Sequence, residues 1–144
     1  MNAAIASWFP YAFPFFFLGL WLFVTTMFRW VSGFSWKTSR DYAHVPVIDR
    51  ALFGSGQIRG IGYRSCLHLL RVDGGFLVRV SRLFGGGSRF IADGDLVRAE
   101  RSTSFFWIPK LAISLRNETL VFYGGSAAFM ARHLTIPVGG DAVA

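Results

Sequence analysis

The chain opens with a long apolar segment and continues with shorter segments in which apolar and polar positions alternate. Residues 3–28 carry no charged side chain, and the first charge along the chain is Arg29. A bilayer core about 30 Å thick needs about 20 helical residues, so this run is long enough to cross a membrane. A cleaved signal peptide is the competing interpretation. It would have a charged n-region, a shorter apolar stretch and a small-residue cleavage site. Here the n-region is uncharged, the apolar run is longer and no A-x-A follows it, which favours the anchor.

Two prolines determine where we expect the spanning helix to begin. Proline is tolerated in a first helical turn and is destabilising in a helix interior by about 3 kcal/mol. The sequence places prolines at positions 10 and 14. We therefore expect a helix from Tyr11 or Phe13 to Trp30, with residues 1–9 along the membrane interface.

Basic residues follow the apolar run and do not precede it. The positive-inside rule then predicts a cytoplasmic C-terminal part and an N-terminus on the other side, periplasmic for a bacterial inner membrane. Aromatic side chains at both ends of the run fit the belts found at membrane interfaces. The residues expected to contact the membrane or partner helices are Trp8, Tyr11, Trp21, Arg29, Trp30, Trp36, Lys37 and Arg40.

The alternating segments predict a small antiparallel β domain closed by one helix. Asp73-Gly74 is a two-residue hairpin signal, and Ser126 is a candidate N-cap for the final helix. Expected strands are residues 63–72, 76–82, 89–92, 95–105, 110–116 and 119–123, and the expected helix is 127–134. The chain then divides into an anchor (1–30), a juxtamembrane linker (31–56) with a short helix around Ile48–Leu52, the β domain (57–134) and a tail (135–144).

One stretch of this β region resembles a known superfold. Tyr63, Cys66, Leu67 and Gly75 match a Tyr-x-x-Cys-Leu strand and glycine hairpin of small bacterial membrane-anchored proteins with a pleckstrin-homology-like (PH-like, or GRAM-like) domain. Residues 90–93 depart from the Ile-Pro-Trp segment of those proteins. The resemblance covers about residues 57–134. It implies a PH-like meander with one C-terminal helix and a binding or scaffolding role, and it leaves open where a lipid would bind.

Composition sharpens this interpretation. The chain has 144 residues, 53% of them hydrophobic and 16% charged, and a net charge of +7. These values exclude a disordered, collagen-like or disulfide-scaffold protein. All the basic residues except Lys37 and Lys110 are arginine, and Cys66 is the only cysteine. A basic soluble part suits an anionic lipid surface or an acidic protein partner.

Five arginines of the β region are expected to gather on one rim and form a basic surface. They are Arg79, Arg82, Arg89, Arg98 and Arg101. Nucleic-acid binding would add exposed aromatic residues among them, which the sequence places elsewhere, so we expect no nucleic-acid partner. Tethering beside an anionic leaflet accounts for the charge more simply.

Candidate chemistry is sparse. His44, His68 and His133 have no metal-ligand spacing, and Cys66 with His68 lacks an orienting acid. The loop Phe84–Arg89 and the segment Gly124–Ser126 offer backbone amides to an anion, but the first joins two strands and lacks the lysine of a phosphate loop. Asp93 and Asp95 are two carboxylates at a turn. We expect no catalytic residue, cofactor or metal.

One apolar run within the β region has three interpretations. Residues Phe105–Ile108 can cap the core, form a contact patch or dip into the bilayer, and the core position is favoured. Taken together, the sequence predicts a non-catalytic single-pass accessory subunit of a bacterial inner-membrane complex, photosynthetic or respiratory, whose helix contacts integral-membrane subunits. The alternative is a membrane-tethered PH-like module that binds anionic lipid or a peptide.

Overall fold

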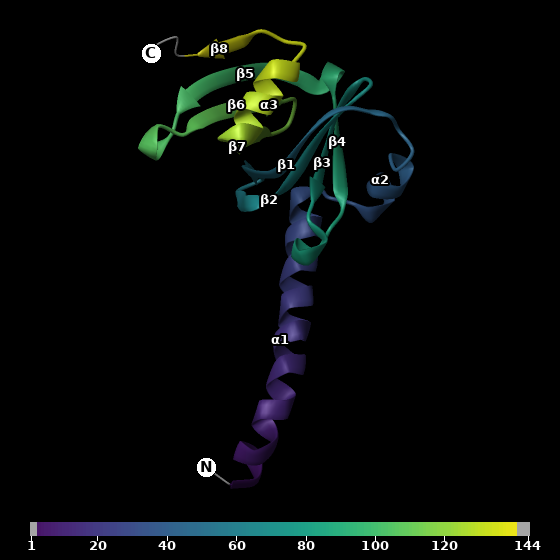
Figure 1. Cartoon of the computed structure of the whole chain (residues 1–144), viewed down its shortest axis with the longest axis vertical. Coiled ribbons are helices and arrows are strands. Elements are labelled where there is room, and N and C mark those ends of the chain that lie inside the picture. Colours follow the sequence, from purple (N-terminus) through teal and green to yellow (C-terminus); the bar gives the residue numbers. More distant parts are fainter. Residues whose placement is uncertain (1–2, 141–144) are drawn as a thin grey trace.

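A long helix stands below a β domain that holds all the other elements (Figure 1). The structure is a computed structural model that describes residues 3–140. Its α-helices are α1 (Ala3–Ser32), α2 (Trp36–Asp41) and α3 (Gly125–His133). Its strands are β1 (Val47–Ile58), β2 (Ile61–Val72), β3 (Gly75–Val80), β4 (Ser88–Ala92), β5 (Leu96–Thr103), β6 (Pro109–Leu115), β7 (Thr119–Tyr123) and β8 (Val138–Gly140). Short 3₁₀ turns are η1 (Arg82–Phe84), η2 (Asp93–Asp95) and η3 (Phe105–Trp107).

The helix α1 runs without a break through Pro10 and Pro14. The expectation that residues 1–9 precede the helix is therefore wrong for residues 3–9, while residues 1–2 lie outside the described part. Proline removes one backbone donor per residue, and an apolar helix accommodates this loss. Residues Ser7–Ser32 are long and apolar enough to be a membrane span, and a signal sequence near an N-terminus has the same character.

The strands form one sheet in the order β4-β3-β2-β1-β7-β6-β5-β8. All neighbours pair antiparallel except β5 and β8, which are parallel. The described residues thus hold eight strands rather than six or seven. The β2–β3 hairpin is confirmed, because Val72 pairs with Gly75 and leaves Asp73-Gly74 as its two-residue loop. The expected tail supplies β8.

The first strand lies where the sequence predicts a linker. Residues 31–56 contain the end of α1, all of α2 and most of β1, so the short helix expected around Ile48–Leu52 is wrong. The sequence did not predict this strand because β1 contains glycines, which are typical of loops. A Cβ on Gly56 would lie 2.7 Å from the carbonyl of Val121, so only glycine lets β1 approach β7 this closely.

The core has two parts, one on each face of the β2–β3 hairpin. The larger cluster includes Leu67, Leu69, Phe76, Ile113, Phe122 and, from α3, Phe129 and Met130. A smaller cluster of Leu70, Val72 and Leu77 is covered by Tyr42, Val45 and Phe90. The segment from α2 to β1 therefore forms a lid over the outer face of the sheet.

Two further expectations are corrected by the fold. Gly124, not Ser126, is the N-cap of α3, and the Ser126 hydroxyl instead accepts a hydrogen bond from the Ser55 amide at 3.0 Å. Residues Phe105–Trp107 do not cap the core, because their side chains are 86–89% exposed. The turn η3 has positive φ angles at Phe106 and Trp107.

Candidate functional site

The C-terminal end of α1 is built into the β domain. The hydroxyl groups of Ser32 and Tyr63 are 2.6 Å apart in a hydrogen bond that is buried on both sides. Phe34, which follows the helix, is 4% exposed and packs edge-on against the Tyr63 ring. Burial raises the pKa of Tyr63 above its usual value. Helix α1 and the β domain are therefore joined by a packed interface.

Two arginines cap the last turn of α1. Arg59 donates to the carbonyl of Val31 at 3.0 Å, and Arg89 donates to the carbonyl of Ser32 at 3.2 Å. Glu118 forms ion pairs with both arginines. Cationic side chains at a helix C-terminus satisfy its free carbonyls and oppose the negative end of its dipole. Burial, together with the charge of Arg59, lowers the pKa of Arg89.

The glycine loop between β3 and β4 packs against α1. The carbonyl of Gly85 accepts hydrogen bonds from Arg29 at 3.2 Å and from the Trp36 indole at 3.1 Å. Gly85 has a φ of 100°, and a Cβ there would lie 3.0 Å from the Thr25 carbonyl. The amides of Gly85 and Gly86 donate to carbonyls within the loop. These two amides are used inside the loop, so they do not cradle a phosphate.

A basic hollow of about 740 Å³ lies between α2 and this loop. The side chains of Arg40, Arg79 and Arg82 line it, and none of the described residues that line it carries a carboxylate. Its other lining residues are Trp36, Ser39, Ala43, Val80 and Gly85–Gly87. Three guanidinium groups around one hollow make it suited to an anion with several oxygens, such as a phosphate.

Hydrogen bonds from neighbouring elements set the floor of this basic hollow. The Arg79 side chain lies 3.4 Å from the hydroxyl of Ser88, which is itself 2.6 Å from the hydroxyl of Ser39. Ser35 and Ser88 form a β-bridge that ties the start of α2 to β4. Beside the hollow, the Arg29 guanidinium lies 4.3 Å from the Trp36 ring centroid. The hollow thus lies next to the end of α1, because Trp36 and Gly85 line it and Arg29 contacts both.

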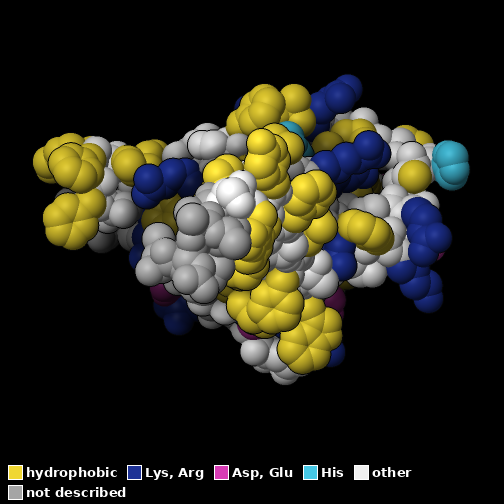
Figure 2. Space-filling model, turned by 90° about the horizontal axis from the view of Figure 1, so that it is seen from below, with side chains coloured by type: hydrophobic (Ala, Val, Ile, Leu, Met, Phe, Trp, Pro, Cys, Tyr) yellow, Lys and Arg dark blue, Asp and Glu magenta, His cyan; other side chains and the backbone are white. Residues whose placement is uncertain are grey.

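The structure separates the five arginines that were expected to share one rim. Arg79 and Arg82 line the basic hollow, and they are joined there by Arg40 from the anchor-side set. Arg89 is held by Glu118 and caps α1. Arg98 and Arg101 lie on β5 with exposed side chains, and Arg98 pairs with Glu100. Viewed along α1 from its N-terminal end, basic side chains flank the apolar helix on more than one side (Figure 2).

The residues expected to contact a membrane or a partner fall into two groups. Trp8, Tyr11 and Trp30 are exposed on α1, and Lys37 is exposed on α2. Trp21, Arg29 and Trp36 instead contact the glycine loop through the hydrogen bonds given above and one from Trp21 to the Leu83 carbonyl at 3.1 Å.

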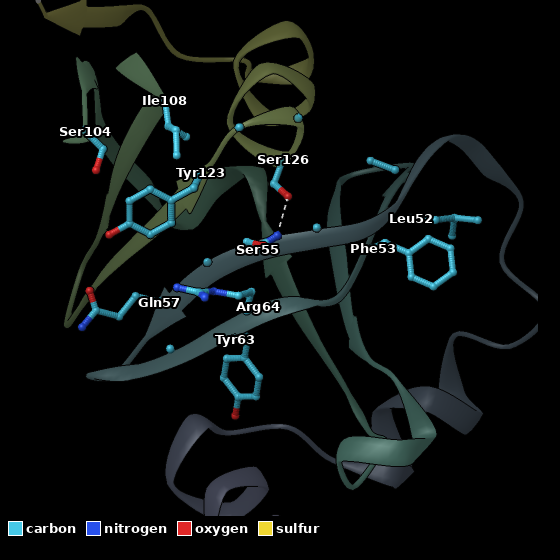
Figure 3. Close-up of a pocket in the computed structure, with 16 residues that line it drawn as sticks. Leu52, Phe53, Ser55, Gln57, Tyr63, Arg64, Ser104, Ile108, Tyr123 and Ser126 are labelled. Carbon is cyan, nitrogen blue, oxygen red and sulfur yellow. Dashed lines mark hydrogen bonds between the residues drawn. The ribbon is translucent and has the colours of Figure 1, made fainter. Parts of the chain in front are cut away.

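A second hollow, of about 850 Å³, lies between β1 and the start of α3. Leu52 and Phe53 stand on one side of it and Tyr123, Ser104 and Ile108 on the other (Figure 3). Its charged lining residue is Arg64, whose side chain is exposed. The dashed contact in the figure is the hydrogen bond from the Ser55 amide to the Ser126 hydroxyl, so these two groups already have a partner within the protein. Apolar and uncharged polar residues line this hollow together with one arginine, whereas three arginines line the basic hollow. The basic hollow is therefore the stronger candidate for a binding site.

The remaining candidates of the sequence are structural. Cys66 is buried in the larger core cluster, and burial raises the pKa of its thiol. The His68 ring packs on Phe53, and burial, with a smaller effect of the Arg79 charge, lowers its pKa. Asp93 forms two hydrogen bonds with Arg71, at 2.7 and 3.0 Å. No group of three or more His, Cys, Asp or Glu residues that could hold a metal ion occurs within residues 3–140.

Several residues that build the site carry no signal in the sequence. Thr25, Ser32 and Ser88 are buried polar residues, and the sequence places them in the predicted anchor, the predicted linker and the glycine loop. Neither a comparison with protein-family models nor a comparison with curated proteins finds a match to this chain. What the structure supports by itself is an N-terminal apolar helix joined to a small β domain.

Proposed function

We propose that this chain is a non-catalytic, membrane-tethered binding module that holds phosphate groups of anionic lipids in the basic hollow. The observation that carries the proposal is the convergence of Arg40, Arg79 and Arg82, without a carboxylate partner among the described residues, beside the end of an apolar helix. Each basic residue near an anionic leaflet contributes about 1 kcal/mol of attraction. The hollow adds directional hydrogen bonds to that attraction.

The strand order supports a PH-like assignment of the domain. The order β4-β3-β2-β1-β7-β6-β5, followed along the chain by a helix that covers the sheet, fits the antiparallel meander and C-terminal helix of that superfold. A fold alone does not define a ligand, so the assignment only makes a binding role more expected.

A membrane orientation accompanies this proposal. Arg29 lies in the last turn of α1, and Lys37 and Arg40 follow in α2, so the positive-inside rule puts the β domain in the cytoplasm. In a bacterial inner membrane the N-terminus would be periplasmic. The anionic headgroups of the cytoplasmic leaflet would then face the basic hollow.

The lipid proposal can be tested on the full chain in a neutral detergent. Phosphatidylglycerol should raise the melting temperature of the wild-type protein more than phosphatidylcholine does, and added salt should reduce the difference. The triple variant R40Q/R79Q/R82Q should lose this difference. The matched variant R98Q/R101Q/R116Q removes three exposed arginines elsewhere and should retain it. Equal responses of the two triple variants would contradict the proposal.

An accessory subunit of a larger membrane complex is the second candidate. The observation that favours it is the cluster Phe105–Trp107, whose three aromatic side chains are almost fully exposed. Exposed apolar clusters of this kind mark interaction surfaces. Blue-native electrophoresis of mildly solubilised membranes tests it: migration within a complex supports a photosynthetic, respiratory or other host, and migration as a lone chain counts against it.

A further inference from the structure

The loop between β3 and β4 runs alongside α1 toward its N-terminal end. A Cβ on Gly87 would touch the Arg29 side chain, and a Cβ on Gly85 would touch Thr25. Further along, the Leu83 carbonyl accepts a hydrogen bond from Trp21. Trp21 precedes Arg29 by eight residues, which is about 12 Å along a helix. The tip of the loop therefore lies beside the uncharged part of α1.

The tip of this loop is apolar and exposed. The Leu83 residue is 76% exposed and Phe84 is 42% exposed. The Phe84 ring packs against the Trp21 ring, with centroids 5.8 Å apart. Exposed apolar side chains of this size are costly in water and favoured in lipid, by about 25 cal/mol for each Å² removed from water. The tip continues the exposed apolar surface of α1.

The length of α1 places this tip at membrane depth. A bilayer core takes about 20 helical residues, and twenty residues counted back from Phe28 begin at Phe9. Trp21 lies well inside that span, and Leu83 and Phe84 lie beside it. Arg82, next to the tip, lines the basic hollow on the domain side. A charged residue directly above an apolar pair matches the boundary between headgroups and acyl chains.

We infer that Leu83 and Phe84 enter the leaflet on the domain side, where they contact acyl chains and form a second point of membrane attachment next to α1. The inference rests on the proposed use of α1 as a membrane anchor. It specifies the ligand of the basic hollow as a lipid that is already part of the bilayer, because Arg82, which lines the hollow, directly precedes Leu83 and Phe84.

Depth-dependent quenching tests this inference on the full chain. Three variants, L83C, F16C and V97C, would each add one cysteine that carries an environment-sensitive fluorophore, and each would be placed in phosphatidylcholine vesicles. Cys66 stays in place, since it is buried, and the wild-type chain gives its labelling background. We expect brominated acyl chains to quench the labels at positions 83 and 16. Aqueous iodide should quench the label at position 97 severalfold more strongly than it quenches the labels at positions 83 and 16.

The results distinguish failure of the inference alone from failure of the inference together with the proposed function. If iodide quenches the label at position 83 as strongly as the label at 97, the inference is overturned and the lipid-headgroup proposal stands. If brominated lipid also fails to quench the label at 16, α1 is not in the membrane and both fail. The same quenching at position 83 in the R40Q/R79Q/R82Q background would show that insertion does not depend on headgroup binding.

Discussion

At the scale of single residues, the contact between Ser32 and Tyr63 joins the anchor to the domain. Replacing Tyr63 by phenylalanine keeps the ring against Phe34 but leaves the buried Ser32 hydroxyl without this partner. We expect Y63F to lower the free energy of unfolding by about 1–2 kcal/mol, measured by denaturant titration of the full chain in detergent. Y123F removes a hydroxyl that makes no hydrogen bond with any residue between positions 3 and 140, so it should change stability little. Equal effects would contradict a special role for Tyr63.

His68 predicts how stability depends on pH. Its Nδ1 atom is buried without a hydrogen-bond partner in the described part of the chain, and its pKa is lowered by burial and, to a smaller extent, by the charge of Arg79. The unfolded chain therefore binds a proton near pH 6.5 that the folded chain binds only at lower pH, so this residue makes folding less favourable as pH falls below about 6.5. H68F should gain stability relative to the wild type as pH falls from about 7.5 to 5.

A comparison with His44 isolates the effect of His68. His44 is exposed, and H44F removes a histidine without touching the buried ring. The difference in unfolding free energy between the wild type and H44F should change less across the same pH range than the difference between the wild type and H68F. A constant difference for H68F would show that His68 takes up its proton equally in both states.

At the scale of elements, the end of α1 depends on one carboxylate in the β6–β7 turn. E118Q would remove the charge that pairs with Arg59 and Arg89 and would leave two guanidinium groups close together. We expect a loss of about 1–3 kcal/mol in the free energy of unfolding, because hydrogen bonds to charged groups are among the stronger ones. E100Q breaks the exposed pair with Arg98 and should cost less than about 1 kcal/mol. Similar losses would mean that Glu118 does not support the helix end.

Strands in which apolar and polar residues alternate regularly could be predicted from the sequence. Elements that depend on close contact between distant backbone segments could not. β2, β3, β6 and β7 follow from their apolar periodicity and from turns such as Asp73-Gly74. β1 was missed because its glycines, which suggest a loop, are required where β1 passes beneath α3 and beside β7. A Cβ on Gly54 would collide with the Ser126 hydroxyl. The predicted start of α1 was too late, because a proline in an apolar helix is less disruptive than a proline in a helix that water surrounds.

At the scale of the whole molecule, the anchor and the domain form a single packed unit. A chain that begins at Gly33 would lose the Ser32–Tyr63 hydrogen bond and both arginine caps, which together contribute about 3 kcal/mol. A chain that begins at Val24 would retain them. We expect the shorter chain to elute as aggregates and to melt at a lower temperature than the longer one, as measured by size-exclusion chromatography and thermal unfolding. Equal melting temperatures would show that the domain is independent of α1.

The basic hollow also belongs to this scale. Its three arginines come from α2, β3 and η1, which meet only because Ser35 bridges to Ser88 and the glycine loop packs against α1. The sequence indicated Arg79 and Arg82 as part of a basic surface and Arg40 as a flank of the anchor. It could not bring them together, since no periodic pattern encodes the contact between α2 and β4.

The caps on the last turn of α1 have a consequence for biosynthesis. Chains are made from the N-terminus, so α1 is synthesised before Arg59, Arg89 and Glu118. Until Arg59 and Arg89 are made and in place, the carbonyls of Val31 and Ser32 lack these two donors. The helix end is therefore completed in two stages, first by Arg59 and Arg89 and then by Glu118, which pairs with both of them, and a ribosome stalled before residue 89 would display a nascent chain whose α1 lacks the Arg89 cap.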